Sequence, residues 1–237
     1  MATLALDQFD VLSFDCYGTL IDWEAGILAA LRTILAARGV DAPDDALLER
    51  YALAEAAAEE GPYLRYREVL AHSADVTARE LGVEPTPGEL AVFGGSVADW
   101  PAFPDSAAAL ARLAGRYRLA ILTNCDDDLF AASNRRLGVT FDEVVTAQQV
   151  GGYKPGLRNF EILLGRVGAP RERVLHVAQS LFHDHVPARQ MGLSTVWINR
   201  RHDRPGSGAT PPAAATPDLT VPSMEAFADL VAEAFRN

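Results

Sequence analysis

The chain has 237 residues, with 21 basic and 32 acidic side chains and a formal net charge of −11 at pH 7. Hydrophobic residues make up 49% of it, enough for a packed core, which excludes a disordered or low-complexity chain. The acidic balance disfavours nucleic acid and anionic membranes as partners, because both bind clustered lysine and arginine, and no apolar stretch approaches the roughly 18 residues of a membrane span.

The first seven residues contain no basic segment, so we identify no signal or transit peptide. The two cysteines, Cys16 and Cys125, are too few for a disulfide framework and fit a reducing compartment. We therefore expect a cytoplasmic protein.

Short apolar runs alternate with helical patterns through most of the chain. The runs are residues 11–14, 119–122, 144–145, 174–177, 195–198 and 219–221, and a closing helix follows at 224–235. Short buried runs separated by helices are typical of parallel strands joined by helical crossovers. The sequence therefore predicts an α/β fold: a Rossmann-like open parallel sheet with helices on both of its faces.

The segment between the first two runs has a different pattern. Residues 27–98 are rich in Ala, Leu, Glu and Arg at helical spacing, and Pro43, Gly61-Pro62 and Pro85 divide the segment into about four helices. We predict an all-helical insertion at residues 25–99, between the two parts of the α/β core at 1–24 and 100–237.

Polar side chains follow several of the predicted strands, at the edge where open parallel sheets bind their ligands. These residues are Asp15, Thr19, Thr123, Asn124, Ser180 and Asp184, and Lys154 joins them from a turn-rich segment after the 144–145 run. A lysine ammonium close to an aspartate lowers the pKa of the carboxyl and keeps it ionised, as a carboxylate nucleophile requires. We therefore expect a catalytic site at this edge of the sheet.

These residues stand in four motifs that resemble those of the haloacid dehalogenase superfamily. Residues 14–22 (FDCYGTLID) are similar to its first motif, 121–124 (ILTN) to its second, 154–155 (KP) to its third and 174–184 (VLHVAQSLFHD) to its fourth. The motifs occur in the family's order and the resemblance covers nearly the whole chain. It implies that the helical insertion is a cap domain over the core.

The resemblance also implies a role for each motif. Asp15 would be the nucleophile that forms a covalent ester, and Lys154 would keep it ionised. Thr123 and Asn124 would hold an oxygen of the substrate, and Asp184 would orient and deprotonate the water that opens the ester.

Two positions favour the 2-haloacid dehalogenases (type II) over the phosphatases of that superfamily. The phosphatases carry a general-acid Asp two residues after the nucleophile, where this chain has Tyr17, and a Mg²⁺-binding Asp where it has Gln179. A neutral amide is a poor ligand for Mg²⁺, whereas a halide leaves without a proton or a metal. We expect a metal-independent hydrolase that removes halide from short 2-haloacids.

The remaining expectations concern substrate and partners. Tyr17, Thr19 and Ser180 are expected to contact a small anionic substrate, and Arg50, with Arg65 and Arg67 as alternatives, is the cap arginine expected to receive the halide. We expect no cofactor, no nucleic acid and no membrane partner, and a homodimer stays open. Two alternatives also stay open: a phosphatase with Mg²⁺ on Asp15 and Asp184, and a catalytically silent binding protein.

Overall fold

The computed structural model describes residues 4–202 and 208–236. Its sheet has six strands in the order β3-β2-β1-β4-β5-β6, and every neighbouring pair is parallel. The strands are β1 (Val11–Phe14), β2 (Arg118–Thr123), β3 (Glu143–Thr146), β4 (Val174–Ala178), β5 (Ser194–Ile198) and β6 (Leu219–Val221). Each contains one of the predicted apolar runs, so the predicted α/β parallel sheet is confirmed.

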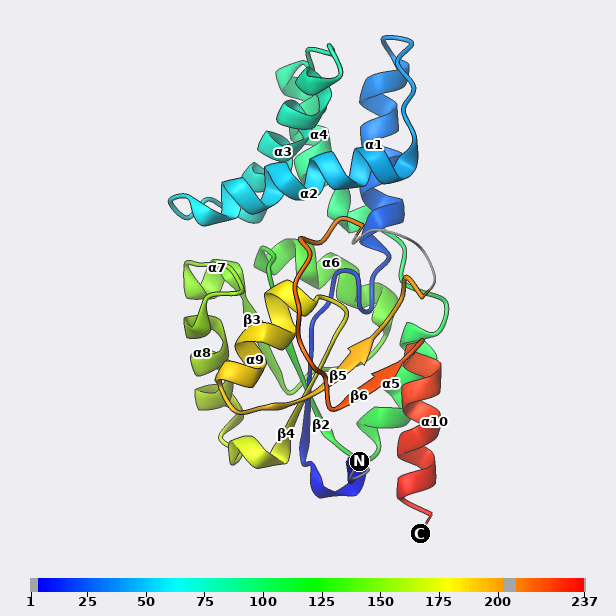
Figure 1. Cartoon of the computed structure of the whole chain (residues 1–237), viewed down its shortest axis with the longest axis vertical. Helices are drawn as coiled ribbons and strands as arrows, with labels where there is room; N and C mark the ends of the chain where they lie inside the picture. The colour runs from blue at the N-terminus through cyan, green and yellow to red at the C-terminus, as the bar shows by residue number, and fades with distance from the viewer. Residues whose placement is uncertain (1–3, 203–207, 237) are drawn as a thin grey trace.

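Helices cover both faces of the sheet (Figure 1). They are α5 (Ser106–Ala114), α6 (Asp127–Leu137), α7 (Ala147–Val150), α8 (Leu157–Val167), α9 (Val186–Gln190) and α10 (Met224–Ala234), with short turns η1 (Leu6–Gln8), η3 (Arg171–Arg173) and η4 (Leu181–His185). Alternate residues of a strand point to opposite faces. Accordingly, Leu12 and Phe14 of β1 pack in the cluster that includes α5, α6 and α10, whereas Val11 packs with α8 and α9.

The segment between β1 and β2 folds into four helices and one 3₁₀ turn, with no strand among its residues. They are α1 (Trp23–Ala36), α2 (Asp44–Glu60), α3 (Tyr66–Glu80), α4 (Pro87–Gly95) and η2 (Ser96–Asp99). We refer to α1–α4 as the cap. In Figure 1 it lies above the sheet, at the end toward which β1 runs. Helix α1 begins at Trp23, two residues before the predicted boundary, and the division into two domains stays a prediction.

The two connections between core and cap lie side by side. Asp22 N–H donates to Pro101 C=O at 2.8 Å, and Phe103 N–H donates to Leu20 C=O at 3.0 Å. Close to this point, Gly26 of α1 faces the indole of Trp100, which is 2% exposed. The cap therefore leaves the core at one well-packed junction.

Replacing Gly26 with alanine is expected to destabilise the protein, because an added Cβ would lie 2.2 Å from Cγ of Trp100. Overpacking of this kind costs about 1–3 kcal/mol. Gly165→Ala in α8 is the matched control, since its Cβ would meet no atom within 4 Å, and helix propensity favours alanine there by about 1 kcal/mol. Urea unfolding measures both changes in the free energy of unfolding. Equal effects at the two glycines would contradict the close packing of Gly26 against Trp100.

No helix in the described ranges combines the length and the hydropathy that crossing a membrane requires.

Candidate active site

The polar ends of the strands meet at a small cavity under the cap. The cavity has a volume of about 30 Å³ and is lined by Asp15, Tyr17, Trp23, Glu55, Glu59, Tyr66, Asn124, Lys154, Ser180, His183, Asp184 and Thr210. Segments that are far apart in the sequence thus contribute to one site, as the parallel topology requires.

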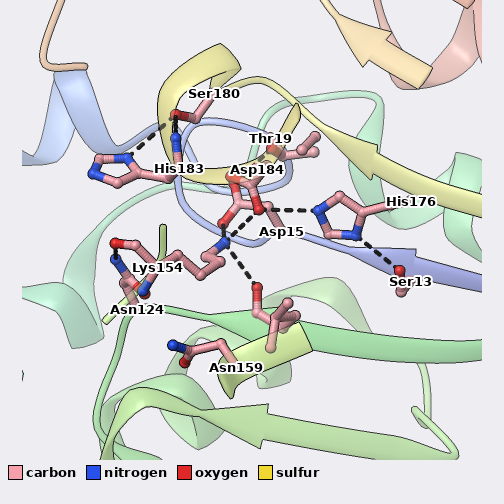
Figure 2. A network of polar contacts seen from close by, with 12 residues as sticks. Ser13, Asp15, Thr19, Asn124, Lys154, Asn159, His176, Ser180, His183 and Asp184 are labelled. Atoms are coloured by element: carbon pink, nitrogen blue, oxygen red, sulfur yellow. Dashed lines mark hydrogen bonds and ion pairs between the residues drawn. The ribbon is translucent and has the colours of Figure 1, made fainter. Parts of the chain in front are cut away.

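Lys154 is the centre of the site, and it is the only lysine of the chain. Its Nζ lies 2.9 Å from Oδ1 of Asp15 and 2.7 Å from Oδ1 of Asp184, between the two carboxylates (Figure 2). The third contact of Nζ is to the carbonyl oxygen of Leu122, at 3.0 Å. An ammonium has three N–H donors, so these partners use all of them.

The three charged groups are almost completely buried, with side-chain exposures of 1% for Lys154, 8% for Asp15 and 1% for Asp184. Burial opposes each charge. It raises the pKa of the Asp15 carboxyl, against the attraction of the Lys154 ammonium. For Lys154 and Asp184 the opposite charges outweigh burial, so the pKa of Lys154 lies above its ordinary value and that of Asp184 well below. Asp184 is therefore firmly ionised, and Asp15 carries the less stabilised charge.

Thr19 fixes the second oxygen of Asp15. Its hydroxyl donates to Oδ2 at 2.7 Å and accepts the Gln179 N–H at 2.9 Å. This places Gln179 beside the site by its backbone, while its side-chain oxygen accepts from Thr210 at 3.4 Å and does not line the cavity. Tyr17 does line it, but its hydroxyl lies 3.0 Å from Oγ of Ser133. Burial raises the pKa of this phenol well above its ordinary value, so Tyr17 contributes an uncharged wall.

The two residues that end β2 differ in position. Asn124 lines the cavity and holds the backbone of Lys154, accepting its N–H at 2.7 Å and donating to its C=O at 3.1 Å. Thr123 is buried and outside the cavity lining, and its hydroxyl makes no hydrogen bond with the described residues. Asn124 thus positions Lys154, a role the sequence motif does not reveal.

The turn η4 brings Ser180, His183 and Asp184 to the cavity. Ser180 Oγ accepts the His183 N–H at 2.9 Å and so caps the turn. On the far side of Asp184, its Oδ1 lies 3.0 Å from Nε2 of His176, whose Nδ1 lies 2.8 Å from Oγ of Ser13 (Figure 2). Oδ2 of Asp184 is buried and has no hydrogen-bond partner within the described part of the chain. This oxygen is therefore free to accept a hydrogen bond from a water molecule in the cavity.

The structure does not bring Arg50 to the site. Its guanidinium is 44% exposed and pairs with Glu80 at 2.8 Å on the surface of the cap. Successive residues of an α-helix are rotated by about 100° around its axis. Arg50 therefore points away from the face of α2 that carries the buried Tyr51 and covers the cavity. Arg65 and Arg67 pair with Asp126, at 3.8 and 3.1 Å, and neither lines the cavity.

Two acidic residues of the cap that sequence reasoning missed line the cavity together with Asp15. Glu55 and Glu59 line the cavity, with side chains that are almost completely buried, and Glu55 follows Tyr51 on the same face of α2. The signal was present in the spacing, because Tyr51, Glu55 and Glu59 recur every four residues in continuation of the apolar stripe. His183 is the third missed residue; burial lowers its pKa to about 4, so it is uncharged at neutral pH.

Glu55→Gln is expected to stabilise the protein at alkaline pH. Burial raises the pKa of Glu55 from 4.5 to about 7, although the hydroxyls of Tyr51 and Tyr66 both donate to Oε1 at 3.0 Å. A raised carboxyl pKa means that folding favours the protonated form, so wild-type stability falls as the pH rises from 4.5 through 7. An amide avoids this loss, which amounts to at most about 3 kcal/mol.

The measurement compares urea unfolding of the wild type and Glu55→Gln at pH 4.5 and pH 8. Glu60→Gln, at the exposed last position of the same helix, is the control. The difference between Glu55→Gln and the wild type should grow with pH, and a difference that stays constant would show that Glu55 titrates normally in the folded protein.

Comparisons with known proteins show which family this chain resembles. A family model described as haloacid dehalogenase-like hydrolase matches residues 9–182. Haloacetate dehalogenase H-2 of Moraxella sp. (strain B) is 26% identical over 230 residues, 96% of this chain and 100% of that protein. Pyrimidine 5′-nucleotidase YjjG of Escherichia coli (strain K12) is 29% identical over 137 residues, 56% of this chain and 61% of its own.

Among solved structures, an L-2-haloacid dehalogenase from Xanthobacter autotrophicus superposes with a TM-score of 0.78 at 24% identity. The superposition covers 94% of this chain and 98% of that one. At this identity the likeness shows a shared fold.

Proposed function

Because the chain belongs to the haloacid dehalogenase-like hydrolases, we propose that it hydrolyses the carbon–halogen bond of short 2-haloacids through an ester on Asp15. The observation that carries the proposal is the buried contact of 2.9 Å between Asp15 and Lys154 at the wall of the cavity. A carboxylate that is paired with an ammonium and largely shielded from water is a competent nucleophile. The haloacetate dehalogenase among the relatives supports this choice of substrate.

In the first step, an oxygen of Asp15 forms a bond to C2 of the substrate while the carbon–halogen bond breaks with inversion, and the halide leaves with the bonding electron pair. No proton donor is required for chloride or bromide, which fits the uncharged Tyr17 in the second position after the nucleophile. Thr19 and Lys154 hold the two oxygens of Asp15 during this attack.

In the second step, a water molecule attacks the ester carbonyl of Asp15 and the bond from this carbonyl carbon to the ester oxygen breaks. One proton of the water passes to the departing oxygen of the 2-hydroxyacid, the other is released to solvent, and the carboxylate of Asp15 is restored. The unpartnered Oδ2 of Asp184 is suited to orient this water. Because the pKa of Asp184 lies well below its ordinary value, we assign it the orientation of the water more than the removal of its proton.

The described side chains do not fit Mg²⁺, which prefers several carboxylate and carbonyl oxygens. Asp15 and Asp184 share the ammonium of Lys154, and Ala178 and Gln179 stand where a further carboxylate would be needed. No cluster of three or more His, Cys, Asp or Glu residues in the described ranges could hold a metal. We therefore propose a reaction without a cofactor.

Assays of the purified protein test the proposal. Halide release from both 2-chloropropionate enantiomers and from fluoroacetate is measured beside p-nitrophenyl phosphate hydrolysis, each with and without EDTA. Halide release that EDTA does not affect is the expected result. Phosphate release that depends on Mg²⁺ would overturn it in favour of a phosphatase, the activity class suggested by the nucleotidase relative. Inactivity toward all these compounds would favour a binding protein.

A further inference from the structure

The cap places two carboxyl groups above the nucleophile. Glu55 and Glu59, which we call the cap carboxyl pair, lie four residues apart on α2 and line the cavity together with Asp15. Glu55 is 3% exposed, and the side chain of Glu59 is 7% exposed. Asn124 Nδ2 lies 3.3 Å from both carboxyl oxygens of Glu59.

An ionised cap carboxyl pair would have no cation as a partner. Lys154 is the one ammonium or guanidinium among the described lining residues, and its three donors already serve Asp15, Asp184 and Leu122. His183 Nε2 lies 3.6 Å from Glu59 Oε2, but this imidazole is uncharged at neutral pH. A buried carboxyl without a cation as partner favours its protonated form.

The groups around the pair affect its protonation. Tyr51 and Tyr66 face Glu55, while Lys154, Asn124, Tyr153 and His183 face Glu59 from the core. Burial is the largest effect on both groups. The hydrogen bonds from Tyr51 and Tyr66 favour ionised Glu55, and Lys154 and Asn124 favour ionised Glu59, but burial outweighs them: the pKa of Glu55 rises to about 7 and that of Glu59 lies well above its ordinary value. Near neutral pH Glu59 therefore bears a proton, and about half of the Glu55 side chains do.

A carboxylic acid has an O–H donor, and the proposed reaction needs a donor on the cap side of the cavity. The halide develops negative charge as it leaves C2, and Lys154 has no free N–H to offer it. We propose that the cap carboxyl pair, in its proton-bearing form, donates the hydrogen bond that receives the departing halide, so that anion binding requires protons on the pair. The proton stays on the carboxyl, and the halide accepts a hydrogen bond from it.

This inference rests on the proposed function of Asp15 and predicts an unusual pH dependence. A group whose pKa is raised bears its proton below that pKa and loses it as the pH rises. The kcat/KM for 2-chloropropionate should therefore fall about tenfold or more between pH 7 and pH 9. An arginine in this role would give no such decline, since guanidinium stays charged throughout that range.

The kinetic test uses the wild type, Glu55→Gln/Glu59→Gln and the control Glu60→Gln. A glutamine amide donates at any pH, so the double variant should keep activity at pH 9 and show a flat profile, while the control follows the wild type. The neutral substrate 2-chloropropionamide tests the opposite hypothesis, in which the cap carboxyl pair is negatively charged and repels an anionic substrate. The proposal is overturned by a flat wild-type profile, or by a wild-type preference for the amide that the double variant reverses.

A binding test does not depend on turnover. Asp15→Asn is titrated with 2-chloropropionate at pH 8 by calorimetry in two buffers of different ionisation enthalpy, which reports the protons taken up. Uptake of up to about one proton per bound anion is expected, and none in Asp15→Asn/Glu55→Gln/Glu59→Gln. Equal binding heats in the two buffers would mean that no proton is taken up and would contradict the inference. Proton uptake without halide release in the wild type would leave the inference standing and refute the proposed reaction.

Discussion

Asp15→Asn is expected to reduce halide release from 2-chloropropionate by on the order of 10⁴-fold or more, as loss of a covalent nucleophile does in other hydrolases. The amide oxygen is a far weaker nucleophile than the carboxylate. The remaining contacts survive, because Lys154 keeps Asp184 and Leu122 as partners. Asp10→Asn, at the other end of β1 and exposed, should have wild-type activity.

Two measurements test whether Asp15 forms the ester. Single turnover in H₂¹⁸O should place heavy oxygen in Asp15, seen as a mass increase of the peptide that contains it, because water attacks the ester carbonyl. Lysine labelled with ¹³C gives one signal in this chain, since Lys154 is the only lysine, and reports whether the cavity is intact in each variant. Residual activity of Asp15→Asn within tenfold of the wild type would rule out the ester mechanism.

Lys154→Met is expected to lower the free energy of unfolding by about 3–5 kcal/mol at pH 8, because it leaves two buried carboxylates without their cation. Activity should disappear with it. The deficit should shrink as the pH falls, since both carboxyls, deprived of the ammonium, bind protons more readily in the folded state than in the unfolded chain.

Urea unfolding at pH 5 and pH 8 measures this pH dependence. The double variant Lys154→Met/Asp15→Asn is the internal control. It removes one of the two carboxylates left without a cation and should recover part of the lost stability, with Asp184 still contacting His176 at 3.0 Å. A deficit that is the same at both pH values would mean that the lost stability comes from packing and not from charge.

The sheet and the position of Asp15 at its edge could be predicted because both depend on local pattern. The runs at 11–14 and 174–177 are too apolar and too short for surface helices, and Asp15 follows the first directly, so topology alone brings it to the ligand-binding edge. Lys154 could be found by its motif. Its link to Asn124 depends on the backbone geometry of two loops that are 30 residues apart, which no pattern reports.

The cap side of the site could not be predicted in the same way. Glutamate is exposed in most proteins, so nothing in the sequence singles out Glu55 and Glu59, and an arginine was expected where anions bind. Which face of α2 is buried depends on how α2 and α3 dock over the core, for example through the bond of 3.0 Å from the Tyr66 N–H to Asp126. Arg50 is one residue away from the buried face.

The contacts of the nucleophile have a consequence for the second half of the proposed reaction. Thr19 holds one oxygen of Asp15 and Lys154 holds the other, so whichever oxygen becomes the ester oxygen, its partner keeps a hydrogen-bond donor. When water adds to the ester carbonyl, that second oxygen becomes an oxyanion in a tetrahedral intermediate. The groups that align the attacking carboxylate are thus already in place as an oxyanion hole, with no rearrangement between the two steps.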